Sequence, residues 1–105
     1  MTRSEAIRRQ FAFLENQSGV SVSASEYPGY ASNCDVKYLF LNGSSIKIWT
    51  DRSDVYVEAH QSHGKVMDIA KLCGSSATYF DEYLNILNNR WKDTIAPWLG
   101  VEACK

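Results

Sequence analysis

The first apolar pattern in the chain has helical spacing. Thr2 or Ser4 can cap the first free amides, and Gly19 can end a helix after about four turns. Between them, apolar residues recur at intervals of three or four positions, namely at Ile7, Phe11 and Leu14. The pattern predicts a helix over residues 3–17 with one face turned to a core.

The next patterns have the two-residue period of β-strands. Residues 20–25 alternate valine or alanine with serine, which is typical of a strand with one dry face. The segment 36–50 has two alternating arms around Asn42 and Gly43, a pair that favours the positive φ angles of a type I′ turn. A further turn then leads into an alternating run at 55–60. These runs predict an antiparallel meander.

The C-terminal third returns to helical spacing. Residues 66–73 fit about two helical turns and end at Gly74. A long helix follows, with Ser75, Ser76 or Thr78 as its cap, and Pro97 predicts an irregular tail from residue 98 onward. Its apolar stripe comprises Phe80, Tyr83, Leu84, Leu87, Trp91 and Ile95.

The elements together predict an α+β fold in a single domain, 1–105. We expect an N-terminal helix, an antiparallel sheet of three to four strands with an Asn-Gly hairpin, one short helix, and a long C-terminal helix packed on the sheet. A chain of 105 residues is long enough for one hydrophobic core.

Composition narrows the function classes. Eleven basic and twelve acidic residues give a net charge of -1, which provides no field to attract nucleic acid or an anionic membrane. No apolar run approaches the length of a membrane span or a secretory signal, and three widely spaced cysteines cannot form a complete disulfide framework. We therefore expect a cytoplasmic protein with reduced thiols, without nucleic-acid or membrane partners.

Candidate reactive groups have simpler structural explanations. His60 and His63 lie three residues apart with Cys73 downstream, but they lack the paired spacing of a zinc site. A small enzyme or ligand-binding domain that uses His60, His63 and Glu58 remains an alternative. The dispersed glycines form no phosphate-binding loop. We predict no metal, no cofactor and no catalytic residues.

The face of the meander that points away from its main apolar stripe carries large aromatic groups with mixed charges. Trp49 and Tyr56 lie on this face near Lys37 and Lys47, a combination that suits a protein hot spot. Helix 3–17 could cover the same face, in which case these aromatics would belong to the core. The predicted partner-binding residues are Tyr27, Tyr30, Trp49, Asp51, Asp54, Tyr56 and Glu58.

In size and order of elements the chain resembles small bacterial toxin-immunity proteins of contact-dependent inhibition and other polymorphic toxin systems. This resemblance implies a non-catalytic protein that binds and inhibits a cognate toxin domain in bacterial competition. A phage or host inhibitor of a defence enzyme makes the same physical demands and is the first alternative. A homodimer formed through an exposed sheet edge also remains open.

Overall fold

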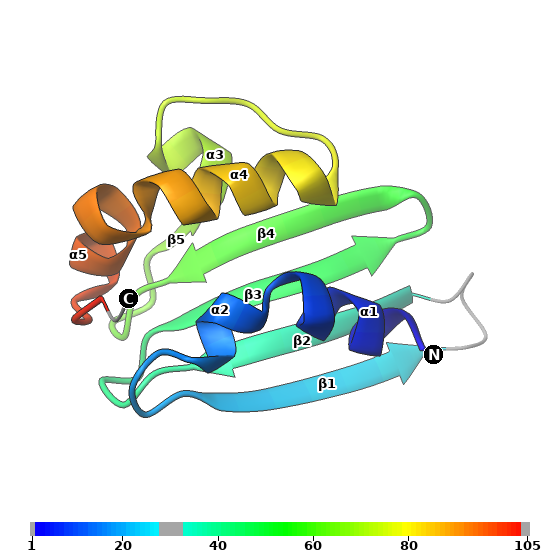
Figure 1. Cartoon of the computed structure of the whole chain (residues 1–105), viewed down its shortest axis with the longest axis horizontal. Coiled ribbons are helices and arrows are strands. Elements are labelled where there is room, and N and C mark those ends of the chain that lie inside the picture. Colours follow the sequence, from blue (N-terminus) through cyan, green and yellow to red (C-terminus); the bar gives the residue numbers. More distant parts are fainter. Residues whose placement is uncertain (1, 28–32, 104–105) are drawn as a thin grey trace.

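The computed structural model describes residues 2–27 and 33–103. The chain forms a five-stranded antiparallel sheet in which the strands follow one another in sequence order (Figure 1). The strands are β1 (Ser21–Tyr27), β2 (Asn33–Leu39), β3 (Ser45–Asp51), β4 (Asp54–His60) and β5 (Val66–Asp68). The helical segments are α1 (Arg3–Gln10), α2 (Ala12–Glu15), α3 (Ile69–Leu72), α4 (Phe80–Arg90), the π-helical turn η1 (Trp91–Ile95) and α5 (Ala96–Leu99). The predicted α+β class is confirmed, with more strands than the sequence indicates.

The N-terminal helix begins where the sequence predicts but does not continue unbroken to residue 17. Thr2 Oγ1 accepts a hydrogen bond from the Glu5 amide at 3.2 Å, and the Glu5 carboxylate accepts one from the Thr2 amide at 3.4 Å. The helix breaks at Phe11 (φ −103°, ψ 30°) and ends at Glu15. Phe11 is fully buried, and its ring packs edge to face on that of Phe80 with 6.1 Å between the ring centroids. The helix is therefore broken at a residue that packs in the core.

The β2–β3 hairpin turns at the predicted residues but with a different geometry. The Phe40 amide donates to the Ser44 carbonyl at 2.9 Å, and Gly43 has a positive φ of 89° whereas Asn42 does not. The loop therefore has three residues with glycine in the left-handed position, and the expected type I′ turn is wrong. Asn42 Nδ2 donates instead to the Leu99 carbonyl at 2.9 Å, which ties the turn to the end of α5.

A short strand, β5, replaces the first part of the helix expected at 66–73. Val66 pairs with His60 and Asp68 pairs with Glu58, so these residues extend the sheet beyond β4. The Asp68 side chain then caps α3 by accepting from the Lys71 amide at 3.1 Å. Three residues are too short a run for periodicity to distinguish strand from helix.

The C-terminal helical path continues through Pro97 to Leu99, so the expected irregular tail begins later than residue 98. In η1 the Ala96 amide bonds to the carbonyl of Trp91, five residues back. This wider turn precedes Pro97, which lies in the first turn of α5, where a missing amide costs no helical hydrogen bond. Gly100 ends the segment with a φ of 78°.

The N-terminal and C-terminal helical segments lie on the same face of the sheet (Figure 1). The Phe13 and Trp91 rings pack edge to face at 6.0 Å, and Phe40, just after β2, lies 5.9 Å from Trp91. Gln17 Oε1 accepts a hydrogen bond from Trp91 Nε1 at 3.1 Å within this buried layer. The inward sheet residues that these helices bury are Val36, Tyr38, Ile46, Ile48, Val57 and Ala59.

Candidate functional site

The opposite face of the sheet has no described helix packed on it. Side chains alternate along each strand, so burying Val36 and Ile48 on the helical side directs their sequence neighbours to the other side. The antiparallel register then aligns these outward residues into rows across β2, β3 and β4. We call this surface the open face. The rows that concern the site are Asp35–Trp49–Tyr56 and Lys37–Lys47–Glu58.

An aromatic stack lies on β3 and β4 of the open face, one row from the β3–β4 turn. Trp49 and Tyr56 are paired in register, and their rings lie nearly parallel, with centroids 4.9 Å apart and an interplanar angle of 17°. Tyr56 remains 37% exposed, and Trp49 is half-buried. Lys47 Nζ lies 5.2 Å from the centre of the Trp49 ring, within the range of a cation–π interaction. The stack is thus held in place while part of its surface stays accessible.

A shallow hollow of about 270 Å³ adjoins the stack. Its walls include Tyr27, Asp35, Trp49 and Asp51. Tyr27 donates a hydrogen bond from its hydroxyl to Asp35 Oδ2 at 2.8 Å, and this bond to the carboxylate raises the pKa of the Tyr27 phenol. The hollow therefore offers an aromatic wall beside carboxylates, a surface suited to a projecting side chain of a partner.

Most of the predicted contact residues gather around this surface. Tyr27, Trp49 and Asp51 line the hollow, and Tyr56 stacks on Trp49. The remaining described members are Asp54, which pairs in register with Asp51 across the β3–β4 turn, and Glu58, which lies one row from the stack. Tyr30 lies outside the described residues. Whether these residues bind a partner stays a prediction.

Sequence reasoning left Asp35, Lys37 and Lys47 out of the predicted contact set. Each belongs to one of the two outward rows of the open face. Alternation along the strands already places Lys37 and Lys47 on this face, but only the strand register puts Asp35 opposite Trp49 and Lys37 opposite Lys47. Registers between strands depend on turn length, and the turn expected at residues 42–43 was of another type.

The candidate catalytic histidines do not form a metal-binding cluster with either of the two described cysteines. His60 Nε2 lies 3.3 Å from Glu58 Oε1, close enough for an ion pair when the imidazole is protonated, but without hydrogen-bond geometry. His63 is exposed in the turn before β5. Among the residues that the structure describes, no three histidine, cysteine or acidic side chains are grouped so as to hold a metal ion.

The two described thiols lie in surroundings that disfavour thiolate. Cys34 is 1% exposed and lies 3.9 Å from Thr50 Oγ1, and burial raises the pKa of its thiol. Burial likewise raises the pKa of the half-buried Cys73. Because the thiolate is the nucleophilic form, burial works against nucleophilic reactivity at both positions.

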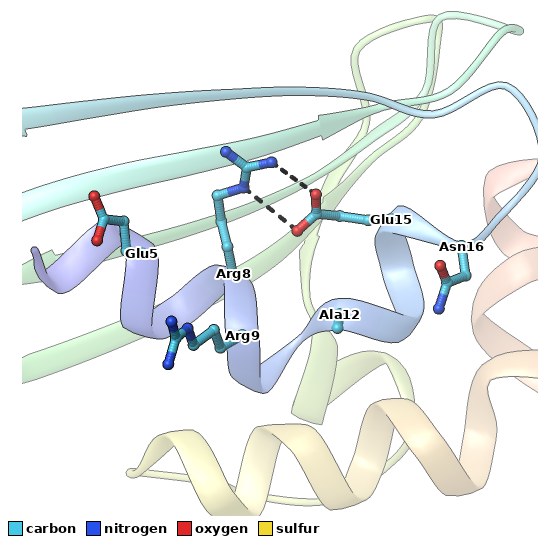
Figure 2. Close-up of a pocket in the computed structure, with 6 residues that line it drawn as sticks. All are labelled: Glu5, Arg8, Arg9, Ala12, Glu15 and Asn16. Atoms are coloured by element: carbon cyan, nitrogen blue, oxygen red, sulfur yellow. Dashed lines mark hydrogen bonds and ion pairs between the residues drawn. The ribbon is translucent and has the colours of Figure 1, made fainter. Parts of the chain in front are cut away.

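A second hollow, of about 530 Å³, lies against α1 and α2 (Figure 2). Figure 2 shows Arg8 and Glu15 reaching toward each other across it, and Arg8 Nη2 lies 2.8 Å from Glu15 Oε1. The hydrogen bond and charge of Glu15 raise the pKa of the Arg8 guanidinium. Arg8 and Glu15 are paired with each other, and none of the described residues that line the hollow is aromatic, so it offers less to a ligand than the open face.

A third hollow, of about 550 Å³, lies between β4 and residues 75–78, and Tyr56 of the aromatic stack is among its lining residues. Asp54, Glu58 and Asp68 contribute carboxylates to its walls. The Tyr83 hydroxyl donates to Asp68 Oδ1 at 2.8 Å, and the Asp68 side chain also caps α3. Burial, followed by the hydrogen bond to Asp68, raises the pKa of the Tyr83 phenol. Both carboxylate oxygens of Asp68 therefore accept hydrogen bonds within the fold.

In the described part of the chain, no helix is both long and apolar enough to cross a membrane. Comparisons of the chain with protein-family models, with curated proteins and with solved structures found no match.

Proposed function

We propose that this chain is a non-catalytic protein-binding module that engages its partner through the open face. The observation that carries the proposal is the Trp49–Tyr56 stack, which stays partly exposed on a sheet face on which no described helix packs. Tryptophan and tyrosine supply a large contact area at a small entropy cost, and they dominate the binding energy of protein interfaces.

The charges around the stack favour a protein over other ligands. Lys37 and Lys47 are paired in one row of the open face, and Lys47 also lines the hollow together with Asp35 and Asp51. A rim that carries both positive and negative groups repels a partner whose charges do not complement it. Such a rim suits the mixed charges of a folded protein surface better than a uniform polyanion. The hollow beside Trp49 can receive one side chain of that partner.

The partner we propose is a bacterial toxin domain, with this chain acting as its immunity protein. The resemblance in size and element order motivates this choice, and an inhibitor of this kind needs a rigid scaffold with aromatic anchors but no reactive group. The scaffold here is the five-stranded sheet with a layer of helices packed on one face over a shared hydrophobic core. Binding to the active surface of a toxin would block it sterically.

Affinity capture from the source cell, with tagged wild-type protein and quantitative mass spectrometry, tests the proposal. We expect a stoichiometric protein partner whose recovery falls at least tenfold, equivalent to about 1.4 kcal/mol, with Trp49→Ala or Tyr56→Ala. Tyr79→Ala is the matched control, because Tyr79 is an aromatic residue 67% exposed outside the open face. Circular dichroism verifies that each variant is folded. Recovery of no partner, or equal recovery with all three variants, would overturn the proposal.

A further inference from the structure

Two lysines face each other across the centre of the open face. Lys37 on β2 and Lys47 on β3 are directly paired in the antiparallel register, and both point away from the buried layer. Like charges in directly opposed cross-strand positions destabilise a sheet. Such a pair persists in a stable fold when another feature compensates for it or when function requires it.

Of the neighbouring carboxylates, Asp35 accepts a hydrogen bond from another side chain, whereas Glu58 lies near the imidazole of His60, with which it forms an ion pair when that imidazole is protonated. Glu58 is the register partner of Lys47 on β4, yet its Oε1 lies 3.3 Å from His60 Nε2. Asp35 accepts the hydroxyl of Tyr27 at 2.8 Å. Within 2–27 and 33–103, neither lysine has a carboxylate at ion-pair distance. Lys47 instead contacts the Trp49 ring, at 5.2 Å.

Resting on the proposed function, we infer that Lys37 and Lys47 form a receptor for a carboxylate that the protein partner presents beside an apolar or aromatic group. The carboxylate would lie between the two ammonium groups and relieve their repulsion, while the apolar group would contact the Trp49–Tyr56 stack next to them. The cation–π contact holds the Lys47 ammonium near this position before the partner arrives.

The surrounding charges favour an isolated carboxylate over nucleic-acid phosphates. Asp35 and Glu58 flank the two lysines on the same face, and Asp51 and Asp54 lie at the end of the strands. A chain of phosphates that crossed the lysines would also meet these acidic groups, and the net charge of -1 offers no wider attraction. A folded partner can place one carboxylate on the lysines and basic groups opposite the acids.

Selection from a random dodecapeptide library on the immobilised full chain tests this inference with a defined probe. We expect enrichment of peptides with one or two aspartate or glutamate residues next to an apolar or aromatic residue. Binding of the selected peptides should fall at least tenfold with Lys37→Gln/Lys47→Gln. It should stay within twofold of the wild type with Lys65→Gln/Lys92→Gln, because both of these lysines are exposed outside the open face.

The variants separate this inference from the proposed function. Peptides that depend on Trp49 but not on Lys37 and Lys47 would overturn the carboxylate receptor and leave the binding face intact. Selected peptides that bind equally well after substitution of Trp49, Lys37 and Lys47 would overturn both the carboxylate receptor and the proposed binding face. Binding of a twenty-nucleotide oligothymidylate that is lost in Lys37→Gln/Lys47→Gln would assign the lysines to phosphate and overturn the carboxylate. Thermal melts confirm folding, and the stability of Lys37→Gln/Lys47→Gln should stay close to that of the wild type, because the loss of the Lys47–Trp49 cation–π contact opposes the relief of the repulsion.

Discussion

The substitution Gln17→Leu tests the contact that joins the two helical segments on one face of the sheet. Gln17 Oε1 accepts the indole N–H of Trp91 at 3.1 Å, and Gln17 Nε2 donates to the Phe13 carbonyl at 3.1 Å. The side chains of Gln17 and Trp91 are only 5% and 3% exposed. Leucine is similar in size to glutamine, so the variant changes hydrogen bonding more than packing.

The main cost of this variant comes from the indole N–H of Trp91, which loses the Gln17 acceptor in a buried site. A buried donor without a partner costs about 1–3 kcal/mol. The contact with the Phe13 carbonyl is only partly buried and contributes less. We expect the free energy of unfolding to fall by about 1–3 kcal/mol, which lowers the Tm by roughly 5–15 °C for a domain of this size.

Urea unfolding followed by far-UV circular dichroism measures this change, and a double-mutant cycle identifies its source. Trp91→Phe removes the donor, so Gln17→Leu/Trp91→Phe should be more stable than the sum of the single effects by about 1 kcal/mol. Gln10→Leu is the matched control, because Gln10 is exposed on α1 and its loss should change stability by less than about 0.5 kcal/mol. A Gln17→Leu variant as stable as this control, or a strictly additive double variant, would refute the reasoning.

Two further predictions concern pH. The Thr78 and Tyr79 amides donate hydrogen bonds to the Glu82 carboxylate and lower its pKa below the ordinary value of 4.5. The stability that these hydrogen bonds contribute is therefore complete above pH 4.5 and is lost as the pH falls through the lower pKa of Glu82 in the folded protein. Glu82→Ala should therefore lower the Tm at neutral pH by an amount that shrinks in acid, and a difference independent of pH would argue against the cap. Burial raises the pKa of the Tyr38 phenol above its ordinary value of 10.0. The stability contributed by burying the neutral phenol is therefore complete below pH 10 and is lost as the pH rises toward the pKa of Tyr38 in the folded protein. In alkaline urea titrations Tyr38→Phe should lose less stability than the wild type between neutral pH and pH 11, and equal losses would contradict the buried phenol.

Several elements could be predicted from local sequence because their signals are local. Thr2 and Glu5 form the capping box that starts α1, since both partners lie within one helical turn. The alternation in β2, β3 and β4 places Val36 and Trp49 on opposite faces as expected, because side chains alternate in any strand. The Asn42–Gly43 pair likewise marked the position of a turn.

The errors arose where a distant contact outweighed the local preference. Asn42 bonds to the Leu99 carbonyl, which is 57 positions away, and the hairpin has a three-residue loop. Val66 to Asp68 form a strand because β4 offers them a free edge. Pro97 does not end the helical path, because a π-helical turn precedes it and places it in the first turn of α5.

The candidate site shows the same division. The sequence by itself determined that Trp49 and Tyr56 share one face of a meander, because the two-residue period is a property of the strand. Only the tertiary structure decided that this face is open, because it depends on where both helical segments pack. The ring contacts of Phe11 with Phe80 and of Phe13 with Trp91 join those segments on the opposite side. Packing between helical segments that are far apart in the sequence therefore leaves the aromatic stack accessible.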